Sequence, residues 1–203
     1  MSIRDLPIVI LAAGSSSRMR GRDKLMETID GVPLLRLQAE KARAVTQGPV
    51  IVTLPAPPHP RHAVLAGLKV TPVAVPDAGD GMSASLRRGI AALPKGSPAA
   101  MILLADLPDL TREDLETVAE AVDFETDTLI WRGTTQTGAP GHPIVFRAAL
   151  FDAFADLTGD RGASSLIALA GDRIAHIPLP GDHARTDLDT PEAWADWRAR
   201  HHR

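Results

Sequence analysis

Two continuously apolar runs constrain the fold of this chain more than any other feature of its sequence. Residues 8–12 (Ile-Val-Ile-Leu-Ala) and 99–105 (Ala-Ala-Met-Ile-Leu-Leu-Ala) contain no polar side chain. A strand that is apolar at every position is buried on both faces, which is typical of the centre of a parallel sheet covered by helices. Both runs are far shorter than the roughly 20 residues that cross a bilayer. They therefore predict central strands of an α/β protein.

The rest of the chain alternates between apolar runs and amphipathic stretches, which is typical of the α/β class. The further strands are predicted at Val50–Leu54, Thr71–Val75, Thr128–Trp131, Pro143–Phe146 and Ile174–Pro178. The helices are predicted at Leu34–Ala44, Ser83–Leu93, Thr111–Val122, Ala148–Asp156, Ala163–Leu169, and from Pro191 onward with Thr190 as N-cap. Thr111 and Asp114 are spaced as in a capping box. Gly138–Pro143 and Pro55–Pro60 are predicted to be loops.

Length and charge exclude several functional classes. A chain of 203 residues without a linker fits a single domain with a full core. The net charge of −3, with no basic block, argues against nucleic-acid binding, and no run is long enough for a membrane span. Cysteine is absent, which removes disulfides and thiolate sites, and Met1–Asp5 does not resemble a signal peptide. We expect a cytoplasmic protein.

A small, hydroxyl-rich loop that carries cations follows the first apolar run. It begins at Gly14, continues through three serines to Arg18, and reaches Lys24. Small side chains let backbone N–H groups approach phosphate oxygens, and the two cations neutralise phosphate charge. A Walker P-loop would need glycine where Met19 stands, and the dinucleotide fingerprint would need glycine where Ser16 stands. The pattern predicts a phosphate-binding loop, with an ordinary polar βα loop as the alternative.

The second apolar run leads directly into Asp106. In open α/β sheets, ligands bind at the carboxyl ends of strands near a point where the strand order reverses, so Asp106 and the Gly14 loop are expected at one edge. A carboxylate beside a phosphate site requires a cation between the two, and Mg²⁺ is typically held by one or two carboxylates together with phosphate oxygens. Asp106 is thus a candidate Mg²⁺ ligand. The alternative is a solvated turn residue before Pro108.

Three other segments are weaker candidates. Asp187 and Asp189 lie on one side of an extended backbone, where either is a candidate second metal ligand, or they favour the start of the final helix. The loop 76–85 offers hydroxyl and N–H groups suited to a base or ribose, although taken alone it is better explained as a Gly-rich turn. His142, between two turn-forming residues, is alone more typical of a structural residue than of a catalyst. No histidine has the spacing of a zinc site.

Six motifs, taken in order, resemble one family. They are the residues 11–19 with 23–25, 81–86, 103–108, 141–146, 159–163 (Gly-Asp-Arg-Gly-Ala) and 187–192. Between Ile8 and Trp194 the chain resembles the nucleotidyltransferases that attach a nucleotide to molybdopterin, most closely the molybdenum cofactor cytidylyltransferase branch. The first motif is shared with sugar-phosphate and isoprenoid-precursor nucleotidyltransferases. The guanylyltransferase branch usually has a Gly-Pro-Leu-type segment where this chain has Gly81-Met82-Ser83.

The resemblance implies a three-layer, Rossmann-like α/β nucleotidyltransferase fold with a mostly parallel central sheet. The single domain, 1–203, would have a nucleotide-binding half at about 1–110 and an acceptor-binding half at about 111–203. Its implied catalytic residues are Arg18, Lys24 and Asp106. Its implied substrate-binding residues are Leu11, Ala12, Ala13, Gly14, Ser16, Asp77, Gly81, Ser83 and Ser85 for the nucleotide and Gly141, His142 and Pro143 for the acceptor. Its implied Mg²⁺ ligands are Asp106 with Asp187 or Asp189.

One departure and several alternatives accompany this resemblance. The usual Arg-Met-Gly is here one residue longer, so Arg20 is either a further phosphate contact or a solvated side chain. The expected reaction transfers CMP from CTP to the terminal phosphate of molybdopterin and releases pyrophosphate. The alternatives are another NTP, another small phosphate acceptor such as a sugar phosphate, and a non-catalytic carrier or insertion partner for the molybdenum cofactor. A molybdoenzyme or its insertion chaperone is a candidate protein partner.

Overall fold

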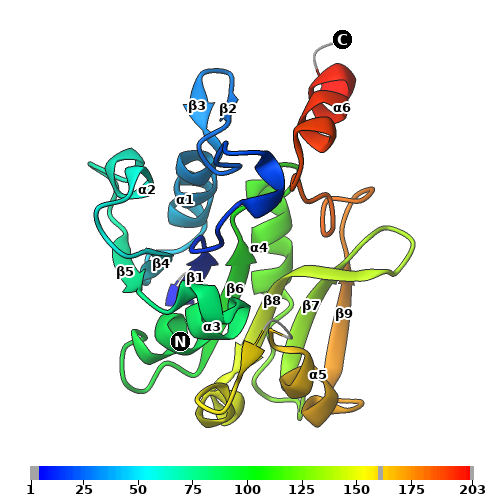
Figure 1. Cartoon of the computed structure of the whole chain (residues 1–203). Helices are drawn as coiled ribbons and strands as arrows, with labels where there is room; N and C mark the ends of the chain where they lie inside the picture. Colours follow the sequence, from blue (N-terminus) through cyan, green and yellow to red (C-terminus); the bar gives the residue numbers. More distant parts are fainter. Residues whose placement is uncertain (1–4, 160–161, 202–203) are drawn as a thin grey trace.

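A seven-stranded sheet with helices on both faces forms the body of the protein (Figure 1). The computed structural model describes residues 5–159 and 162–201, so Met1–Arg4 and two residues of the 159–163 motif, Asp160 and Arg161, lie outside the described residues. The sheet order is β5-β4-β1-β6-β8-β7-β9. The strands are β1 (Ile8–Leu11), β4 (Val50–Pro55), β5 (Thr71–Val75), β6 (Ala99–Leu104), β7 (Ile130–Thr134), β8 (Pro140–Arg147) and β9 (Ile174–Pro178). Only β8 among these runs antiparallel to its neighbours, which confirms the predicted mostly parallel α/β sheet.

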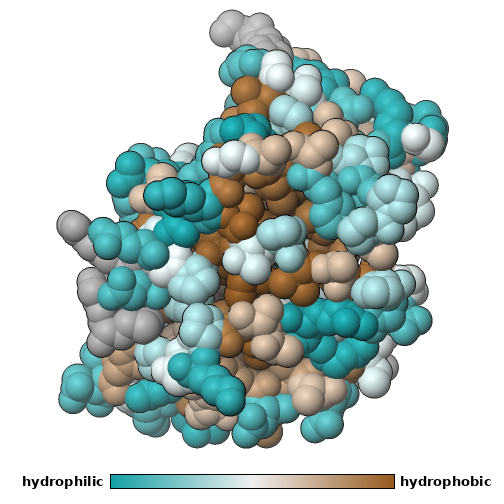
Figure 2. All heavy atoms as spheres, turned by 90° about the vertical axis from the view of Figure 1, so that its left-hand side faces the viewer, coloured by the Kyte–Doolittle hydropathy of each residue, from teal (hydrophilic) through white to brown (hydrophobic). Residues whose placement is uncertain are grey.

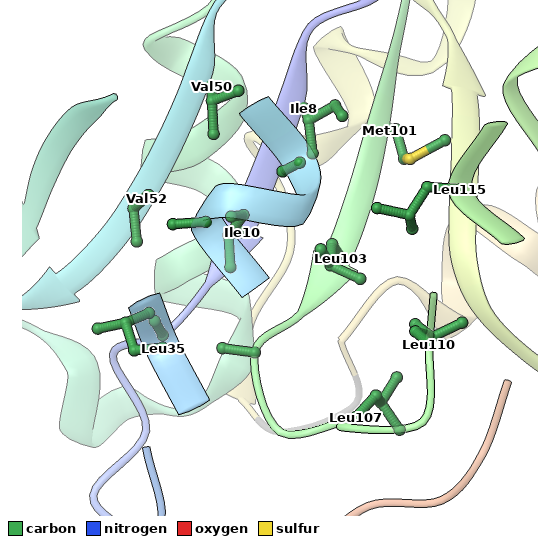
Figure 3. Close-up of a cluster of buried hydrophobic side chains, with 14 of the residues drawn as sticks. Ile8, Ile10, Leu35, Val50, Val52, Met101, Leu103, Leu107, Leu110 and Leu115 are labelled. Atoms are coloured by element: carbon green, nitrogen blue, oxygen red, sulfur yellow. The ribbon is translucent and has the colours of Figure 1, made fainter. Parts of the chain in front are cut away.

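The two apolar runs form neighbouring central strands, as predicted. β1 and β6 pair in parallel, with Ile8 opposite Met101 and Leu11 opposite Leu104. Their alternate side chains enter two separate cores, one on each face of the sheet. Figure 3 shows the first core, in which Ile10 and Leu103 lie among other aliphatic side chains. The burial of both faces explains why neither run contains a polar residue.

Helices cover the two faces unequally. Buried residues of α1 (Leu34–Val45), α4 (Arg112–Glu120) and α6 (Pro191–His201) belong to the first core. α3 (Met82–Ala91) and α5 (Ser164–Ala170) contribute to the second. The capping box predicted at the start of α4 is present, because the Thr111 and Asp114 side chains each accept the other's backbone N–H. α3 lies close against β1 at Gly89, where a Cβ atom would be 2.5 Å from Val9 Cγ1.

Several sequence-based boundaries were wrong. The predicted loop Gly138–Pro143 becomes strand from Pro140, because β8 continues its pairing with β7 as far as Thr134. The predicted helix Ala148–Asp156 is two 3-10 turns, Ala148–Leu150 and Asp152–Phe154. The connector Pro55–Pro60 ends in a short helix, α2 (Pro60–Val64), with proline at its first position. The small hairpin of β2 (Thr28–Ile29) and β3 (Val32–Pro33) carries too few residues for an alternation signal.

The strand order reverses next to β1. The chain passes from β1 outward to β4 and β5, and then crosses to β6 on the other side of β1. The crevice at the carboxyl ends of β1 and β6 is therefore the topological switch point, where ligands bind in open α/β sheets. Figure 2 views the molecule from the left-hand side of Figure 1 and shows apolar residues in the middle of a mostly hydrophilic face. No helix in the described part of the chain is long and apolar enough to cross a membrane.

Candidate active site

A cavity of about 990 Å³ lies at this switch point. The loop that follows β1, the start of α3 and the residues after β6 all contribute to its wall. The sequence-predicted residues that line it are Leu11, Ala12, Ala13, Gly14, Ser16, Arg18, Lys24, Gly81, Ser85, Asp106 and Asp189. The structure thus brings the serine-rich loop and Asp106 to one edge of the sheet, as the order of strands and loops in the sequence predicted.

The loop after β1 turns sharply around its serines. Ser16 has a left-handed backbone conformation (φ 54°) and precedes a 3-10 turn, Ser17–Met19, whose Met19 side chain is fully buried. Arg20 ends that turn with φ 53°. Its side chain is not part of the cavity wall and pairs at 2.7 Å with Glu192, where both side chains are more than half exposed. The additional residue is therefore accommodated at the surface, where such an ion pair contributes little stability.

A buried arginine that no sequence pattern indicated holds this loop and lies in the cavity wall. The Arg61 side chain, on α2, is 1% exposed. It donates hydrogen bonds to Ala12 O (2.6 Å), Gly14 O (2.8 Å) and the Ser16 hydroxyl (3.0 Å). It also pairs through two nitrogens with both carboxylate oxygens of Asp23, at 2.6 and 2.8 Å. Burial acts to raise the pKa of Asp23, but the hydrogen bonds and charge of Arg61 lower it below its ordinary value.

Lys24 occupies the centre of a charged cluster. Its ammonium group bonds to a carboxylate oxygen of Asp106 and, at 2.5 Å, to Asp189 Oδ1, and each of these three side chains is about 15% exposed. Arg18 binds the other Asp189 oxygen. Burial acts to lower the pKa of Lys24, but its two carboxylate partners raise it. Partial burial likewise acts to raise the pKa of Asp189, but the hydrogen bond and charge of Lys24 lower it below its ordinary value.

The carboxylates of this cluster suit a small divalent cation. The second oxygen of Asp106, Oδ1, is buried and has no hydrogen-bond partner among the described residues. Lys24 already places one positive charge between Asp106 and Asp189. Mg²⁺ takes one or two carboxylates and completes its shell with water and phosphate, so Asp106 and Asp189 would suffice as its protein ligands. The oxygen-only donor set fits the same ion.

Asp187 lies at the border of the cluster and does not line the cavity. Partial burial, a hydrogen bond with Asp189 and the charges of Asp189 and Asp106 together raise its pKa. The 187–189 segment is not a strand, but the hydrogen bond between Asp187 and Asp189 still places the two carboxylates side by side, as predicted. Thr190 caps α6, accepting the Ala193 N–H at 3.1 Å.

The loop before α3 contributes only part of its predicted residues. Gly81 and Ser85 line the cavity together with Ala78, Gly79 and Met82. Asp77 does not, since its carboxylate pairs with Arg88 at 2.7 Å and with Arg87 at 3.3 Å. Ser83 is fully buried behind the wall, and its hydroxyl has no partner among the described residues.

The predicted acceptor residues lie in β8, outside the cavity wall. Gly141 is required by packing, because a Cβ atom there would lie 2.2 Å from Ala184 O. His142 donates its backbone N–H to the same carbonyl at 2.9 Å. Burial, aided by the charge of Arg132, lowers the pKa of His142 to about 3, so its imidazole is neutral at physiological pH.

Known protein families and curated proteins share sequence with this chain. The model of the MobA-like NTP transferase domain matches residues 8–176. A "Probable molybdenum cofactor guanylyltransferase" of Nostoc sp. is 36% identical over 121 residues, which are 60% of this chain and 55% of that protein. The chain therefore spans about half the length of the curated relatives it matches.

Solved structures extend the likeness to the whole chain. The structure of an rv0371c homolog from mycobacterium sp. strain JC1 has a TM-score of 0.81, with 25% identity over 98% of both chains. A nucleotidyl transferase from Methanothermobacter thermautotroptrophicus has a TM-score of 0.76, with 19% identity over 96% of this chain and 97% of that one, and shows the same fold. The architecture is that of α/β nucleotidyltransferases.

Proposed function

The chain belongs to the family of the MobA-like NTP transferase domain, and we propose that it transfers a nucleotide from an NTP to the terminal phosphate of molybdopterin. The observation that carries the proposal is the position of Lys24, which bonds two carboxylates at the mouth of a serine-rich loop in one large cavity. Cations, backbone N–H groups and carboxylates at a single strand edge are what a metal–triphosphate substrate requires.

The residues of the cavity would bind the triphosphate and position its α-phosphorus for attack. The Gly14–Ser17 backbone and the cations Arg18 and Lys24 would bind the triphosphate, in exchange for the carboxylates that these cations now contact. An oxygen of the acceptor phosphate attacks the α-phosphorus, the bond to the bridging oxygen breaks, and pyrophosphate leaves with the electron pair. The nucleophile is already an anion, so no residue has to remove a proton.

Asp106 and Asp189 would hold Mg²⁺, which when bound would neutralise charge that develops on the leaving pyrophosphate. Both carboxylates face Lys24, whereas Asp187 stands outside the cavity wall. This contrast supports Asp189 rather than Asp187 as the second ligand. Lys24 and Arg18 would keep the leaving group in place, and catalysis would depend on positioning and charge rather than on covalent chemistry.

Two observations favour different nucleotides. The Gly81-Met82-Ser83 segment at the start of α3, of which Gly81 and Met82 line the cavity, resembles the cytidylyltransferase branch and supports CTP. The curated relatives are named guanylyltransferases, which supports GTP. We propose CTP as the substrate, since two residues of the segment that distinguishes the branches, Gly81 and Met82, line the cavity, and GTP as the second candidate.

A nucleotide panel tests the proposal. The protein is incubated with Mg²⁺, molybdopterin and each of CTP, GTP, ATP and UTP, and pyrophosphate is measured over time. We expect many turnovers per protein with CTP, and none when molybdopterin is omitted. Turnover with GTP alone would move the assignment to the second candidate. In a parallel set with a sugar phosphate in place of molybdopterin, turnover that molybdopterin does not support would replace the acceptor. Stoichiometric cofactor binding without pyrophosphate release would identify a carrier and refute the proposed activity.

A further inference from the structure

A second cationic group, Arg132 with Arg185, lies beside the predicted acceptor residues of β8 and has no carboxylate partner among the described residues. Arg132, on β7, is half-buried, and its Nε donates to Gly141 O at 3.1 Å. Neither Arg132 nor Arg185 forms an ion pair within residues 5–159 and 162–201. The two guanidinium groups contact the carbonyls of neighbouring residues, Gly141 and Pro140, and burial together with the charge of Arg185 lowers the pKa of Arg132.

Backbone contacts connect this pair to the carboxylate cluster. The segment 184–189 begins at β8, where Ala184 O accepts the His142 N–H at 2.9 Å. It ends beside β6, where the Leu188 N–H donates to Asp106 O at 3.2 Å. Arg185 stands at the β8 end of this segment, and its guanidinium contacts Pro140 O at 3.4 Å. The segment 184–189 therefore has Arg185 at its end near β8 and Asp189 at its other end, in the carboxylate cluster.

The backbone of β7 is irregular directly after Arg132. The β7–β8 register shifts between Arg132 and Thr134, and at Gly133 a Cβ atom would lie 2.8 Å from His142 O. Bulges of this kind change the direction of a side chain and are frequent beside active sites. Ile130 and Ile144 belong to the core on the α3 face, and alternation along β7 places Arg132 on that same face.

The free nitrogens of Arg132 indicate what this position binds. Only Nε is engaged by a described residue, so both terminal nitrogens remain available as donors. A guanidinium presents two parallel N–H groups that match the oxygens of a phosphate group. A half-buried cation next to a second cation gains stability when an anion enters between them. An oxyanion is therefore the kind of ligand that suits this position, which no carboxylate among the described residues occupies.

We propose that Arg132, with Arg185 beside it, forms an oxyanion subsite that holds a phosphate-type group of the acceptor. This assignment of the anion to the acceptor rests on the proposed function. The anion-binding property itself does not, because it follows from the charge and the free donors of these two side chains. Arg132 is then a specificity-determining residue for anionic acceptors, distinct from Arg18 and Lys24 at the triphosphate.

Binding of inorganic phosphate tests the subsite without any turnover. The Nε–H resonance of Arg132 is identified in ¹H–¹⁵N spectra by its loss in Arg132→Gln, and phosphate is titrated into the NTP-free protein. We expect a saturable shift of this resonance, which also distinguishes the subsite from phosphate that enters the Gly14 loop. In Arg112→Gln, which removes one exposed cation of α4, the shift should persist. A resonance of Arg132 that phosphate does not move would overturn the proposal.

The KM values for acceptor and nucleotide then test whether the bound anion belongs to the acceptor. With the nucleotide and acceptor identified by the panel, Arg132→Gln should raise the acceptor KM by about 10- to 100-fold, the loss expected for a hydrogen bond to a charged group. The nucleotide KM and the thermal midpoint should stay near wild type, and Arg132→Lys should recover part of the acceptor affinity. An equal rise in both KM values would show a structural role and overturn the assignment. Absence of turnover with every nucleotide would refute the proposed function, while the phosphate titration would still decide the subsite.

Discussion

Replacing Arg61 with methionine tests whether one buried side chain holds the phosphate loop. Methionine keeps most of the apolar stem but removes the guanidinium, which donates to two backbone carbonyls and the Ser16 hydroxyl and pairs with Asp23. The carbonyls belong to Ala12 and Gly14, which form the cavity wall. Arg61 also lines the cavity but is not among the proposed substrate contacts, so the substitution acts on substrate binding through the position of the loop.

The cost follows from the groups that lose their partner. Removing one member of a buried ion pair costs about 3–5 kcal/mol, because the other charge remains desolvated. The Asp23 side chain is 23% exposed, so water can partly replace the lost partner, and we expect the lower end, about 3 kcal/mol. For a domain of this size each kcal/mol lowers the thermal midpoint by roughly 2–4 °C, which gives a decrease of about 6–12 °C.

Two assays and one companion variant check this reasoning. Thermal unfolding is compared for Arg61→Met, Asp23→Asn and the double variant, in which no unpaired charge remains; the double variant should be more stable than Arg61→Met alone. At a temperature where the single variant is folded, we expect NTP affinity to fall by at least about tenfold, since small displacements of positioning groups have large effects. A thermal midpoint within about 2 °C of wild type, together with unchanged NTP affinity, would refute the positioning role.

The remaining predictions concern charge, packing and pH. Asp106→Asn should lower turnover by about 10²–10³-fold, and near-normal pyrophosphate release would contradict its assignment. Gly89→Ala should destabilise the fold by about 1–3 kcal/mol in urea unfolding, because its Cβ would lie 2.5 Å from Val9 Cγ1, whereas Gly14→Ala, whose Cβ meets nothing within 4 Å, should weaken only NTP binding. The pKa of His142 is about 3 in the folded state and near 6.5 when unfolded, so stability is lost as the pH falls below 6.5. Between pH 6.5 and 5 the loss should exceed that of His142→Gln by about 2 kcal/mol, and an imidazole NMR signal that titrates near pH 6.5 would contradict this.

The centre of the fold could be predicted because its residues satisfy strong local constraints. Thr71–Val75 and Ile174–Pro178 have the predicted bounds, and β1 and β6 differ from prediction by one residue at their ends. Apolar runs between turn residues determine such strands with little help from the rest of the chain. The meeting of Asp106 with the Gly14 loop follows from the general position of ligands at carboxyl ends of parallel strands.

The parts that escaped prediction depend on contacts between distant segments. Arg61 stands in a Pro-rich stretch, where nothing in the sequence indicates burial; it is buried because it meets carbonyls 47 and 49 residues earlier in the chain. β8 begins at Pro140 because β7 is available to pair with it. The proposed role of Arg132 likewise depends on its neighbours in the fold, Gly141 and Arg185, which are distant from it in the sequence. A periodic pattern carries none of this information.

The charged cluster has a consequence for substrate binding that does not require any catalytic assumption. Lys24 and Arg18 neutralise Asp106 and Asp189 in the ligand-free protein, so a triphosphate that enters alone must take cations from carboxylates and leave them unpaired. A triphosphate that enters with Mg²⁺ replaces the lost charge at the same time.

NTP affinity should therefore be about 5–150-fold higher with Mg²⁺ than with a chelator, and the affinity for the metal should rise by the same factor when NTP is present. Calorimetric titration measures both. In Asp189→Asn the gain should shrink, because one of the two carboxylates that need compensation is gone. Equal NTP affinities with and without the metal in the wild-type protein would show that these carboxylates and the triphosphate do not share their cations.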